Sequence, residues 1–568
     1  MQSTEAGAMT PTRQRPRALR IACGAGCIAA LVPLAWLDPQ QRQVGLYFSW
    51  LAAMGLYLMQ WPVPRGWVRW RPPPALIGAL VVYVGLVLFT FCRVYDNWRW
   101  AVTGDSLNFF VIGQDLARGN PAVNWLSVRG VFEQCTVVQA TLQSVFMHLS
   151  ESLFAHRLGN VLTSALIVFA AAAFAAETSG ATAALLLALF LPLHSVFDYF
   201  TLISYPNLSG LLPYFAAYAL FGAAWTVWES GFLWAALGLV CGLAGYFLPL
   251  WFAAVAAVSA ATVLSALYWR TPSVFLIWAG GVAIALIPAA LQFSTFLHVL
   301  FWFQPGSGLS VSYILAIAQQ AALLPFTSTL GGYGASGPWL RPPFGYLWSA
   351  GVGLAAISGV LALLRRPRGR VLRHAWIWLV LLASDVAGLS AANSGYPVVS
   401  VKRAIVMLPN MTFLMILPLA WVAERIGRTW VTGALTLAAL LPFAYLNLTT
   451  LWTLESGYNV PDGMIRAVQT LPGQLLLVSQ HPDLHNDFGP SRPDRDPVQE
   501  LYHVRDRTIV TSVIPAQRGD FERVVCYSRH VDGLEWGAQV QAALAQLCPG
   551  KPVEQLTAQL ECVTCDPA

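Results

Sequence analysis

Charged residues are scarce in this chain. They make up 11% of its 568 residues, and 57% of the residues are hydrophobic, whereas an ordinary soluble domain has about 25% charged residues. Lysine is nearly absent, because Lys402 and Lys551 are the only two and arginine supplies the rest of the positive charge. These shortages exclude an ordinary soluble protein and predict that lipid is the main solvent for most of the chain.

Two other absences narrow the class of function. The chain has no glycine-rich nucleotide loop with a following Lys-Ser/Thr pair, which argues against an ATP-driven pump. No small-residue cleavage site follows the first apolar run convincingly, so we interpret this run as a helix rather than a removed signal peptide. The net charge of +6 comes from short arginine clusters between apolar runs, which is typical of topology signals and not of nucleic-acid binding.

What the chain has in abundance is apolar runs close to the length of about 20 residues that crosses a bilayer. We place transmembrane helices at about residues 19–37, 44–61, 75–92, 157–176, 181–196, 208–228, 232–246, 249–268, 273–292, 346–364, 375–392, 404–423 and 430–451. The predicted fold is therefore an all-α polytopic membrane bundle of about thirteen helices. It comprises residues 19–454, between a tail at 1–18 and a small soluble α+β domain at 455–568.

Arginine clusters predict the orientation of this bundle. They lie at residues 13–20, 65–71, 365–373 and 425–428, and cytoplasmic turns carry such an excess of positive charge. The eight helices predicted between the second and third clusters form an even number, as two turns on the same side require. We expect a bacterial inner-membrane protein with a cytoplasmic N-terminus and a periplasmic C-terminal domain.

Two predicted outer loops are long, at residues 93–156 and 293–345, and long loops in compact proteins are often functional. In the first, residues 105–118 and 139–154 have helical apolar spacing, which predicts amphipathic helices at the membrane surface. The second contains several glycines between residues 331 and 337. It is either a mobile segment that closes over a ligand or a solvent-exposed connector.

Asp96 and Asp105 follow the third predicted helix, at the outer membrane face. A carboxylate there can accept a proton from a sugar hydroxyl or coordinate a divalent cation. The alternative is a solvated loop acid or an ion-pair partner for Arg99.

The order of several segments carries a resemblance to a known family. The segment from Gly104 to Gly119, GDSLNFFVIGQDLARG, resembles the first outer loop of the GT-C superfamily of membrane glycosyltransferases. HRLGNVL from His156, Pro192 with residues 207–218, and VKRAIVMLP from Val401 resemble later blocks in the same order. The resemblance covers most of residues 75–450.

This resemblance implies a function. Members of the superfamily transfer sugars from polyprenyl-phosphate-linked donors on the non-cytoplasmic side, with an outer-loop Asp as base or metal ligand. Asp105 would be that residue, with Mg²⁺ or Mn²⁺ as the possible cation. Many relatives carry Asp-Glu followed by Tyr, whereas Ser106 follows Asp105 here.

Other polar residues fall near the outer face. Lys402 and Arg403 can bind a lipid phosphate or pyrophosphate, or they are snorkelling interface cations. His194, Asp198 and Tyr205 can assist acid–base chemistry or substrate binding, or the histidine is simply satisfied at the interface. Further candidates are Glu133 in the first outer loop and the membrane-embedded Asp385, which is either functional or part of a polar packing seam.

The tail from residue 455 reads as soluble sequence. Strands are expected at 475–478, 508–513 and 524–527, and a helix ending near Leu547. One or two disulfides are plausible in an oxidising compartment among the four cysteines of the tail, with a redox CxxC or half a zinc site as the alternative. These cysteines are Cys526, Cys548, Cys562 and Cys565.

The leading hypothesis is a glycosyltransferase that moves a sugar from a polyprenyl-phosphate-linked donor to a lipid, glycan or protein acceptor. Lys402 and Arg403 would hold the donor phosphate and Asp105 would activate the acceptor hydroxyl. One alternative is a transporter or flippase, although no clear internal repeat supports it. The other is a non-catalytic assembly protein that binds partners through its outer loops and tail.

Overall fold

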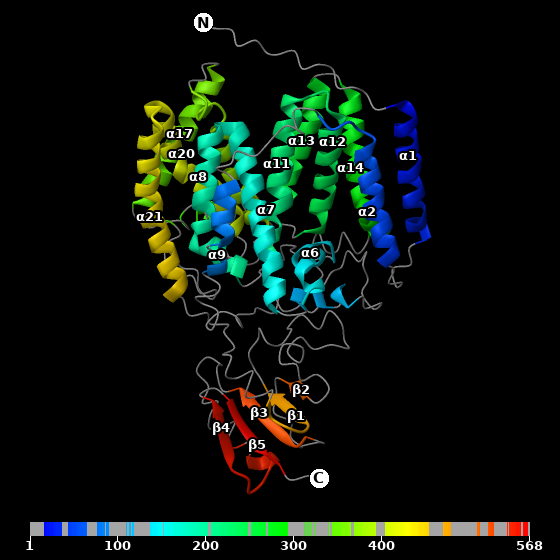
Figure 1. Ribbon diagram of the computed structural model, residues 1–568, viewed down its shortest axis with the longest axis vertical. Coiled ribbons are helices and arrows are strands. Elements are labelled where there is room, and N and C mark those ends of the chain that lie inside the picture. Colours follow the sequence, from blue (N-terminus) through cyan, green and yellow to red (C-terminus); the bar gives the residue numbers. More distant parts are fainter. Residues whose placement is uncertain are drawn as a thin grey trace.

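The computed structural model consists of a helical bundle with a small β-sheet beyond one of its ends (Figure 1). The residues that it describes are 16–36, 44–64, 77–85, 87–89, 109–110, 113–114, 116–118, 137–150, 153–202, 206–247, 252–268, 271–293, 312, 315–316, 318–319, 323, 340, 343–364, 369–392, 404–453, 470–478, 508–511, 521–527, 542, 545–557 and 560–565.

The described helices follow the predicted apolar runs. The main ones are α1 (Arg17–Leu31), α2 (Val44–Met59), α6 (Val137–Gln143), α7 (Leu153–Ser179), α8 (Ala181–Phe190), α9 (Ser195–Leu202), α10 (Pro206–Ser209), α11 (Leu211–Thr226), α12 (Gly231–Leu243), α13 (Phe252–Tyr268), α14 (Pro272–Leu291), α17 (Phe344–Leu363), α18 (Trp376–Ala392), α20 (Leu408–Ile426) and α21 (Thr429–Thr453). Short 3-10 turns include η2 (Val145–His148), η3 (Leu191–Leu193) and η6 (Ile405–Met407). Residues 77–85 and 87–89 are also helical.

Among the described residues, six helices are long and apolar enough to cross a membrane, and a bent pair of helices at 181–202 brings the number to seven. Shorter apolar helices occupy Gly45–Met59, Ile77–Phe89, Leu211–Thr226, Gly231–Tyr246, Ala256–Leu267 and Trp376–Leu389. The chain is a multi-pass membrane protein. The count of about thirteen crossings stays a prediction.

Proline inside α14 is compensated by aromatic side chains. Pro288 has no N–H, so the Ile284 carbonyl, four residues earlier, has no helical donor. The indole N–H of Trp50 in α2 donates to that carbonyl at 3.0 Å. The Tyr246 hydroxyl donates to the Ala285 carbonyl at 2.9 Å and accepts from the Ala289 N–H at 3.2 Å. In lipid, where water cannot satisfy the backbone, such contacts fix α2 and α12 against α14.

A glycine brings α17 against the kinked region of α20. Pro418 in α20 leaves the Leu414 carbonyl without its helical donor. Gly351 of α17 packs on this carbonyl so closely that a Cβ atom at position 351 would overlap the oxygen. Small residues at helix interfaces of membrane proteins allow this kind of backbone approach.

Gly351→Ala is therefore expected to lower the free energy of unfolding by about 1–3 kcal/mol, because the two helices must move apart. Gly353→Ala is the matched control, since a Cβ at position 353 meets nothing within 4 Å. That change should be neutral or stabilising, because alanine favours a helix over glycine. Thermal melting of the purified protein measures both, and equal melting temperatures would contradict the close contact.

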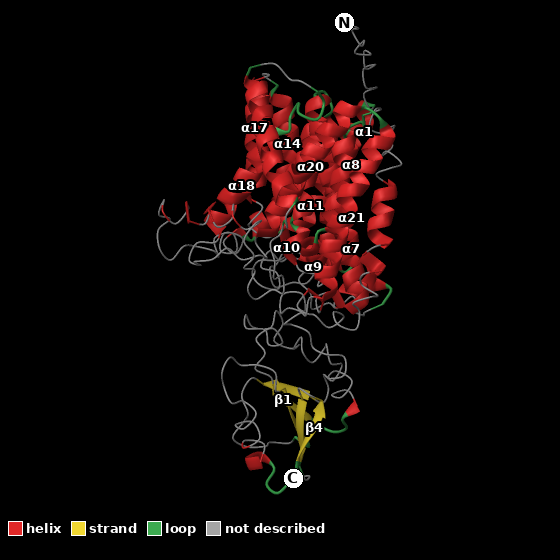
Figure 2. Cartoon of the chain, turned by 90° about the vertical axis from the view of Figure 1, so that its left-hand side faces the viewer, coloured by secondary structure: helices red, strands yellow, loops and turns green. Residues whose placement is uncertain are grey.

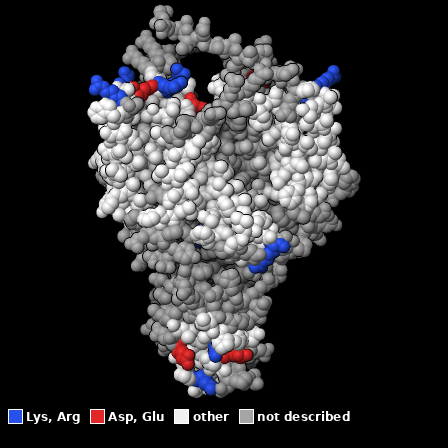
Figure 3. Space-filling view, viewed as in Figure 1, with Lys and Arg blue, Asp and Glu red and all other residues white. Residues whose placement is uncertain are grey.

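Basic residues gather at the end of the bundle opposite the sheet (Figure 3). The described arginines there are Arg17 and Arg20 at the start of α1, Arg370 and Arg373 before α18, and Arg425 and Arg428 between α20 and α21. This distribution agrees with the predicted cytoplasmic clusters at 13–20, 365–373 and 425–428 in placing them at one common end.

The strands, drawn in yellow in Figure 2, form one five-stranded sheet. Their order is β2-β1-β3-β5-β4 (Figure 1). These are β1 (Leu475–Val478), β2 (Thr508–Thr511), β3 (Arg523–Tyr527), β4 (Val553–Thr557) and β5 (Leu560–Thr564). The central strand pair β1–β3 is parallel, as is β1–β2, while β3–β5 and β5–β4 are antiparallel. The three predicted strands are confirmed within two residues, and the sequence interpretation missed β4 and β5.

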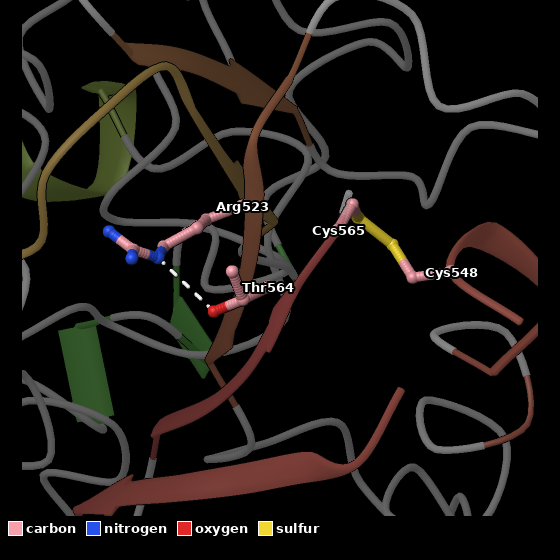
Figure 4. The surroundings of a disulfide bond; sticks show 4 residues. All are labelled: Arg523, Cys548, Thr564 and Cys565. Carbon is pink, nitrogen blue, oxygen red and sulfur yellow. Dashed lines mark hydrogen bonds between the residues drawn. A yellow bond between two sulfur atoms is a disulfide. The ribbon is translucent and has the colours of Figure 1, made fainter. Parts of the chain in front are cut away.

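A disulfide joins Cys548 to Cys565, just beyond the end of β5 (Figure 4). Its Cα atoms are 5.3 Å apart, inside the usual range. Both cysteines pack with Leu476, Val524 and Val563 in the core of the sheet domain. Cys562 is free and buried, and the side chain of Cys526 lies outside the described residues. The prediction of at least one disulfide is confirmed, and the Cys562-Cys565 pair is not a redox CxxC.

Burial raises the pKa of the Cys562 thiol to about 11. The thiolate is the reactive form, so Cys562 is expected to resist maleimide at pH 7.5 and to react about tenfold faster for each unit of pH increase below this pKa. Peptide mass spectrometry should find Cys548 linked to Cys565 and Cys562 labelled only after unfolding. Rapid labelling of native protein at pH 7.5 would contradict this burial, and Cys562→Ser identifies the labelled position.

Candidate active site

Two of the predicted site residues lie in described parts of the chain. These are His194 and Asp198, which fall at the bend that separates α8 from α9. The other predicted site residues lie outside the described residues: Asp96, Asp105, Glu133, Tyr205, Lys402 and Arg403. The described part of the candidate site lies on the helices on either side of the first outer loop.

The bend begins at Pro192 in η3 and turns the chain by 61° between α8 and α9. His194 is the extended residue at the break, and its Nδ1 accepts the Val196 N–H at 3.3 Å. The Asn447 side chain of α21 accepts the Ser195 N–H at 3.0 Å. Both contacts satisfy N–H groups at the start of α9 that have no helical acceptor.

His194 thus has a structural role at this bend. Because Nδ1 accepts a hydrogen bond, the neutral ring carries its proton on Nε2. The ring is fully buried and lies 6.0 Å from the ring of Phe443 in α21. These contacts favour the interface histidine over an acid–base residue, which were the two alternatives left open by the sequence.

Asp198 is the main polar group that the bend places in the interior. Its side chain is 1% exposed, and neither carboxylate oxygen accepts a hydrogen bond from any residue that the structure describes. A buried carboxylate without a partner is costly, and such groups concentrate at functional sites. Asp198 is therefore a candidate site residue whose hydrogen-bonding capacity is not used by the described part of the chain.

Tyr83 lies beside Asp198. It belongs to the helical residues 77–85, which precede the first outer loop in the sequence, and its side chain is buried. Its hydroxyl is close enough to the Asp198 carboxylate to interact with it electrostatically and is adjacent to Ser164 and Thr201. Its ring packs 6.4 Å from that of Phe197. The third helix and α9 thus meet through a mixed aromatic and polar contact.

A polar seam continues along the first turns of α7. The Asn160 amide donates to the Thr201 carbonyl at 2.8 Å and to the Phe200 carbonyl at 3.2 Å. The side-chain amide of Gln143 in α6 donates to the side-chain oxygen Oδ1 of Asn160 at 3.3 Å. The Ser164 and Thr201 hydroxyls are 2.9 Å apart. These bonds tie α6, α7 and α9 together.

The first outer loop packs against the same end of α7. Phe109 and Phe110 are buried, and the Phe110 ring lies 6.0 Å from the ring of buried His156 in an edge-to-face arrangement. Gly113 contacts Met147 and Ser144 so closely that a Cβ would overlap them. This packing anchors the segment that follows Asp105 in the sequence. The helical residues described within 109–118 agree with the predicted helix at 105–118. The predicted helix at 139–154 is instead divided, because α6 ends at Gln143, η2 follows it and α7 begins at Leu153.

Asp385 occupies a packing seam. The Tyr214 hydroxyl of α11 donates to Asp385 Oδ1 at 3.0 Å, and the Asn410 amide of α20 donates to Asp385 Oδ2 at 2.5 Å and to the Tyr214 oxygen at 3.1 Å. The carboxylate is 5% exposed. This network fixes α11, α18 and α20 relative to one another. Of the two alternatives for Asp385, a functional residue or part of a polar packing seam, the packing seam accounts for its contacts.

Sequence reasoning missed Tyr83, Asn160, Ser164 and Thr201. One signal was present, because Asn160, Thr163 and Ser164 are polar residues on one face within an apolar run. Within the described residues, no three His, Cys, Asp or Glu side chains come together as ligands for a metal ion. The predicted metal ligand, Asp105, is not among those residues.

Asp198→Leu is expected to raise the free energy of unfolding by about 1–3 kcal/mol, because it removes a buried acceptor that has no hydrogen-bond partner among the described residues. The same change should lower activity by roughly 10- to 100-fold if the carboxylate accepts a hydrogen bond from substrate. Thermal melting and the sugar-transfer rate give the two readouts, and Thr163→Val is the control, because the Thr163 hydroxyl donates to the Gly159 carbonyl of its own helix. Reduced stability with unchanged activity would assign Asp198 a structural partner instead.

Known proteins resemble this chain in structure but not detectably in sequence. No protein-family model and no curated protein sequence matches it. The crystal structure of ArnT from Cupriavidus metallidurans bound to undecaprenyl phosphate superposes with a TM-score of 0.50 at 15% identity, over 86% of this chain and 98% of ArnT. The chain has a GT-C fold.

A second GT-C protein is also similar. The oligosaccharyltransferase AglB from Archaeoglobus fulgidus, determined with an inhibitory peptide and a dolichol phosphate, gives a TM-score of 0.46 at 11% identity, over 83% of this chain and 71% of AglB. The predicted resemblance to the GT-C superfamily is confirmed at the level of the fold.

Proposed function

We propose that this protein is a membrane glycosyltransferase that transfers a sugar from a polyprenyl-phosphate-linked donor to a lipid, glycan or protein acceptor. The observation that carries the proposal is the GT-C fold, which extends over 98% of ArnT, a protein crystallised with undecaprenyl phosphate. The buried Asp198 carboxylate, which accepts no hydrogen bond from a described residue, adds a polar group at the end of the bundle that faces the sheet. A fold alone does not fix a function, so the local chemistry has to support it.

The reaction is proposed to take place at the non-cytoplasmic face of the bacterial inner membrane. Disulfides form in oxidising compartments, and the Cys548–Cys565 bond lies in the sheet domain. Arginine-rich turns stay in the cytoplasm, and most of the described arginines outside the sheet domain gather at the opposite end of the bundle (Figure 3). Both signals favour a cytoplasmic N-terminus and a periplasmic C-terminal domain.

In the proposed mechanism, Asp105 acts as the general base. The acceptor oxygen forms a bond with the anomeric carbon as the bond from that carbon to the donor phosphate oxygen breaks. The hydroxyl proton passes to Asp105, and polyprenyl phosphate leaves with the electron pair. Direct displacement of this kind inverts the anomeric carbon. Asp96, which precedes Asp105 by nine residues in the sequence, is the second candidate base.

Cations and polar groups would position the two substrates. Lys402 and Arg403 precede α20 in the sequence and are proposed to bind the donor phosphate, Arg403 with two parallel hydrogen bonds. Asp198 is proposed to accept hydrogen bonds from sugar hydroxyls, with His194 shaping the bend that holds it. Tyr205 and Glu133 remain candidates for contacts with the acceptor.

The experiment is sugar transfer in membranes that contain the wild-type chain, tested with a panel of radiolabelled polyprenyl-phosphate donors. We expect label in an acceptor with at least one donor and none with matched membranes that lack the chain. Absence of transfer with every donor, together with retained binding of polyprenyl phosphate, would favour the assembly-protein alternative. Movement of intact donor across the membrane without transfer would favour the flippase.

A further inference from the structure

Two turns at the arginine-rich end of the bundle are held together by one carboxylate. Glu424, in the last turn of α20, accepts the Arg370 N–H at 2.6 Å and the Val371 N–H at 3.2 Å. The turn before α18 therefore lies against the turn between α20 and α21, although more than fifty residues separate them. Gly369, with a φ of +78°, brings the backbone close to this carboxylate.

Four arginines project from these two turns. The side chains of Arg370, Arg373, Arg425 and Arg428 are exposed. Among the residues that the structure describes, their guanidinium groups form no ion pair or hydrogen bond, and one of them, Arg425, stacks over Trp421 with its Cζ 5.6 Å from the ring centre. Within the part of the chain that the structure describes, these four charges therefore have no acidic partner.

Nothing in these two turns cancels the positive charge. Glu424 is their only carboxylate, and backbone N–H groups already occupy it. His374 adds no charge at neutral pH, because burial and the neighbouring Arg373 lower its pKa. The partner should therefore be an anion.

Exposed apolar residues border the arginines. Leu363 is the last residue of α17 and Leu364 follows it, while Trp430, which is 72% exposed, is the second residue of α21. An apolar surface beside an arginine cluster at the end of membrane-spanning helices matches a ligand with acyl chains and a charged headgroup. A free anion would use only the arginines.

We propose that Arg370, Arg373, Arg425 and Arg428 form a binding site for the headgroup of an anionic phospholipid. The phosphodiester accepts hydrogen bonds from the guanidinium groups, and the acyl chains lie along α17 and α21. This site is at the opposite end of the bundle from Asp198. A lipid bound to all four arginines would bridge the same two turns that Glu424 joins within the protein.

The test is a titration of the full-length, detergent-purified protein with dihexanoyl phosphatidylglycerol. The melting temperature at each lipid concentration gives the apparent affinity. We expect the apparent affinity to fall about fivefold for each arginine replaced by glutamine, measured in Arg370→Gln/Arg373→Gln and Arg425→Gln/Arg428→Gln. Replacement of all four with lysine keeps the charge and should keep the affinity within about fivefold. The control is Arg17→Gln/Arg20→Gln, at the same end of the bundle, which should leave the affinity unchanged.

Three results would overturn the proposal. Unchanged affinity in both glutamine pairs would remove the arginines from the site. An equal loss in the α1 control would indicate a general surface-charge effect. Equal stabilisation by inorganic phosphate, at the same ionic strength, or by dihexanoyl phosphatidylcholine would mean that an anionic lipid is not what is recognised. If a glutamine pair does not fold, the same titration is made with its two single replacements.

Discussion

Asp105→Asn is expected to lower the rate of sugar transfer by roughly 10²- to 10⁴-fold, the usual contribution of a general base. Asparagine keeps the size of the side chain but cannot take the proton of the acceptor hydroxyl at neutral pH. The helix that follows this position is anchored by Phe110 against His156 and by Gly113 against Met147. The loss should therefore appear in turnover, while donor binding changes little.

The measurement is the initial transfer rate at saturating donor, with matched protein levels in the membrane. Asp115→Asn is the control, because it removes a carboxylate from the same segment of sequence. Equal rates in wild type and Asp105→Asn would remove Asp105 from the mechanism. A large loss in Asp96→Asn alone would move the role of base to Asp96.

The double replacement Lys402→Ala/Arg403→Ala is expected to raise the KM for the donor by roughly 10²-fold or more. Each hydrogen bond between a cation and a phosphate contributes about 1.5–3 kcal/mol when both partners are held in place. Because the donor phosphate is present in both the bound donor and the transition state, most of the effect should fall on KM. Arg403→Lys should recover part of the affinity, since it restores charge without the two-pronged geometry.

Donor titrations of the transfer rate test this expectation. Lys551→Ala, in the sheet domain, is the control for loss of a lysine elsewhere. An unchanged KM would leave Lys402 and Arg403 as interface cations. A lower melting temperature of the variant without added donor would indicate a role in holding the start of α20.

The helices of the bundle could be predicted because hydrophobic runs of bilayer length are a strong signal. The same signal says little about bends. The break between α8 and α9 depends on Pro192 and on the capping of α9 by His194 and Asn447, a contact between residues more than two hundred positions apart. Likewise, the sequence could not decide between a functional and a packing role for Asp385, because Tyr214 and Asn410 come from other helices.

The sheet domain illustrates a second limit. β1 is a continuous apolar run and was easy to predict, whereas β4 contains Glu554 and Gln555 and β5 contains Glu561. Only Ala558 and Gln559 separate these two strands, without the glycine or asparagine that marks a tight hairpin. The disulfide partner of Cys548 was equally unreadable, because pairing depends on the register of β5 in the sheet.

The candidate site was predicted in part. Asp198 was selected from its position in an outer turn, and its burial without a partner among the described residues is consistent with a role in binding. Tyr83 and the α7 seam were missed, because a lone tyrosine or serine inside an apolar run is more often a packing residue. What makes them notable is that Tyr83 interacts with Asp198 and that the Ser164 and Thr201 hydroxyls lie 2.9 Å apart, contacts between helices that only the fold provides.

The most direct test of the account uses purified protein in lipid vesicles and a donor that carries radiocarbon in the sugar and radiophosphorus in the polyprenyl phosphate. We predict that radiocarbon moves to the acceptor while an equal amount of radiophosphorus is recovered in the released polyprenyl phosphate. With Asp105→Asn, both labels should stay together on the intact donor. Transfer of both labels together would contradict the proposed bond cleavage. Absence of any transfer by the wild type, with an acceptor that intact membranes can glycosylate, would contradict the assignment as a glycosyltransferase.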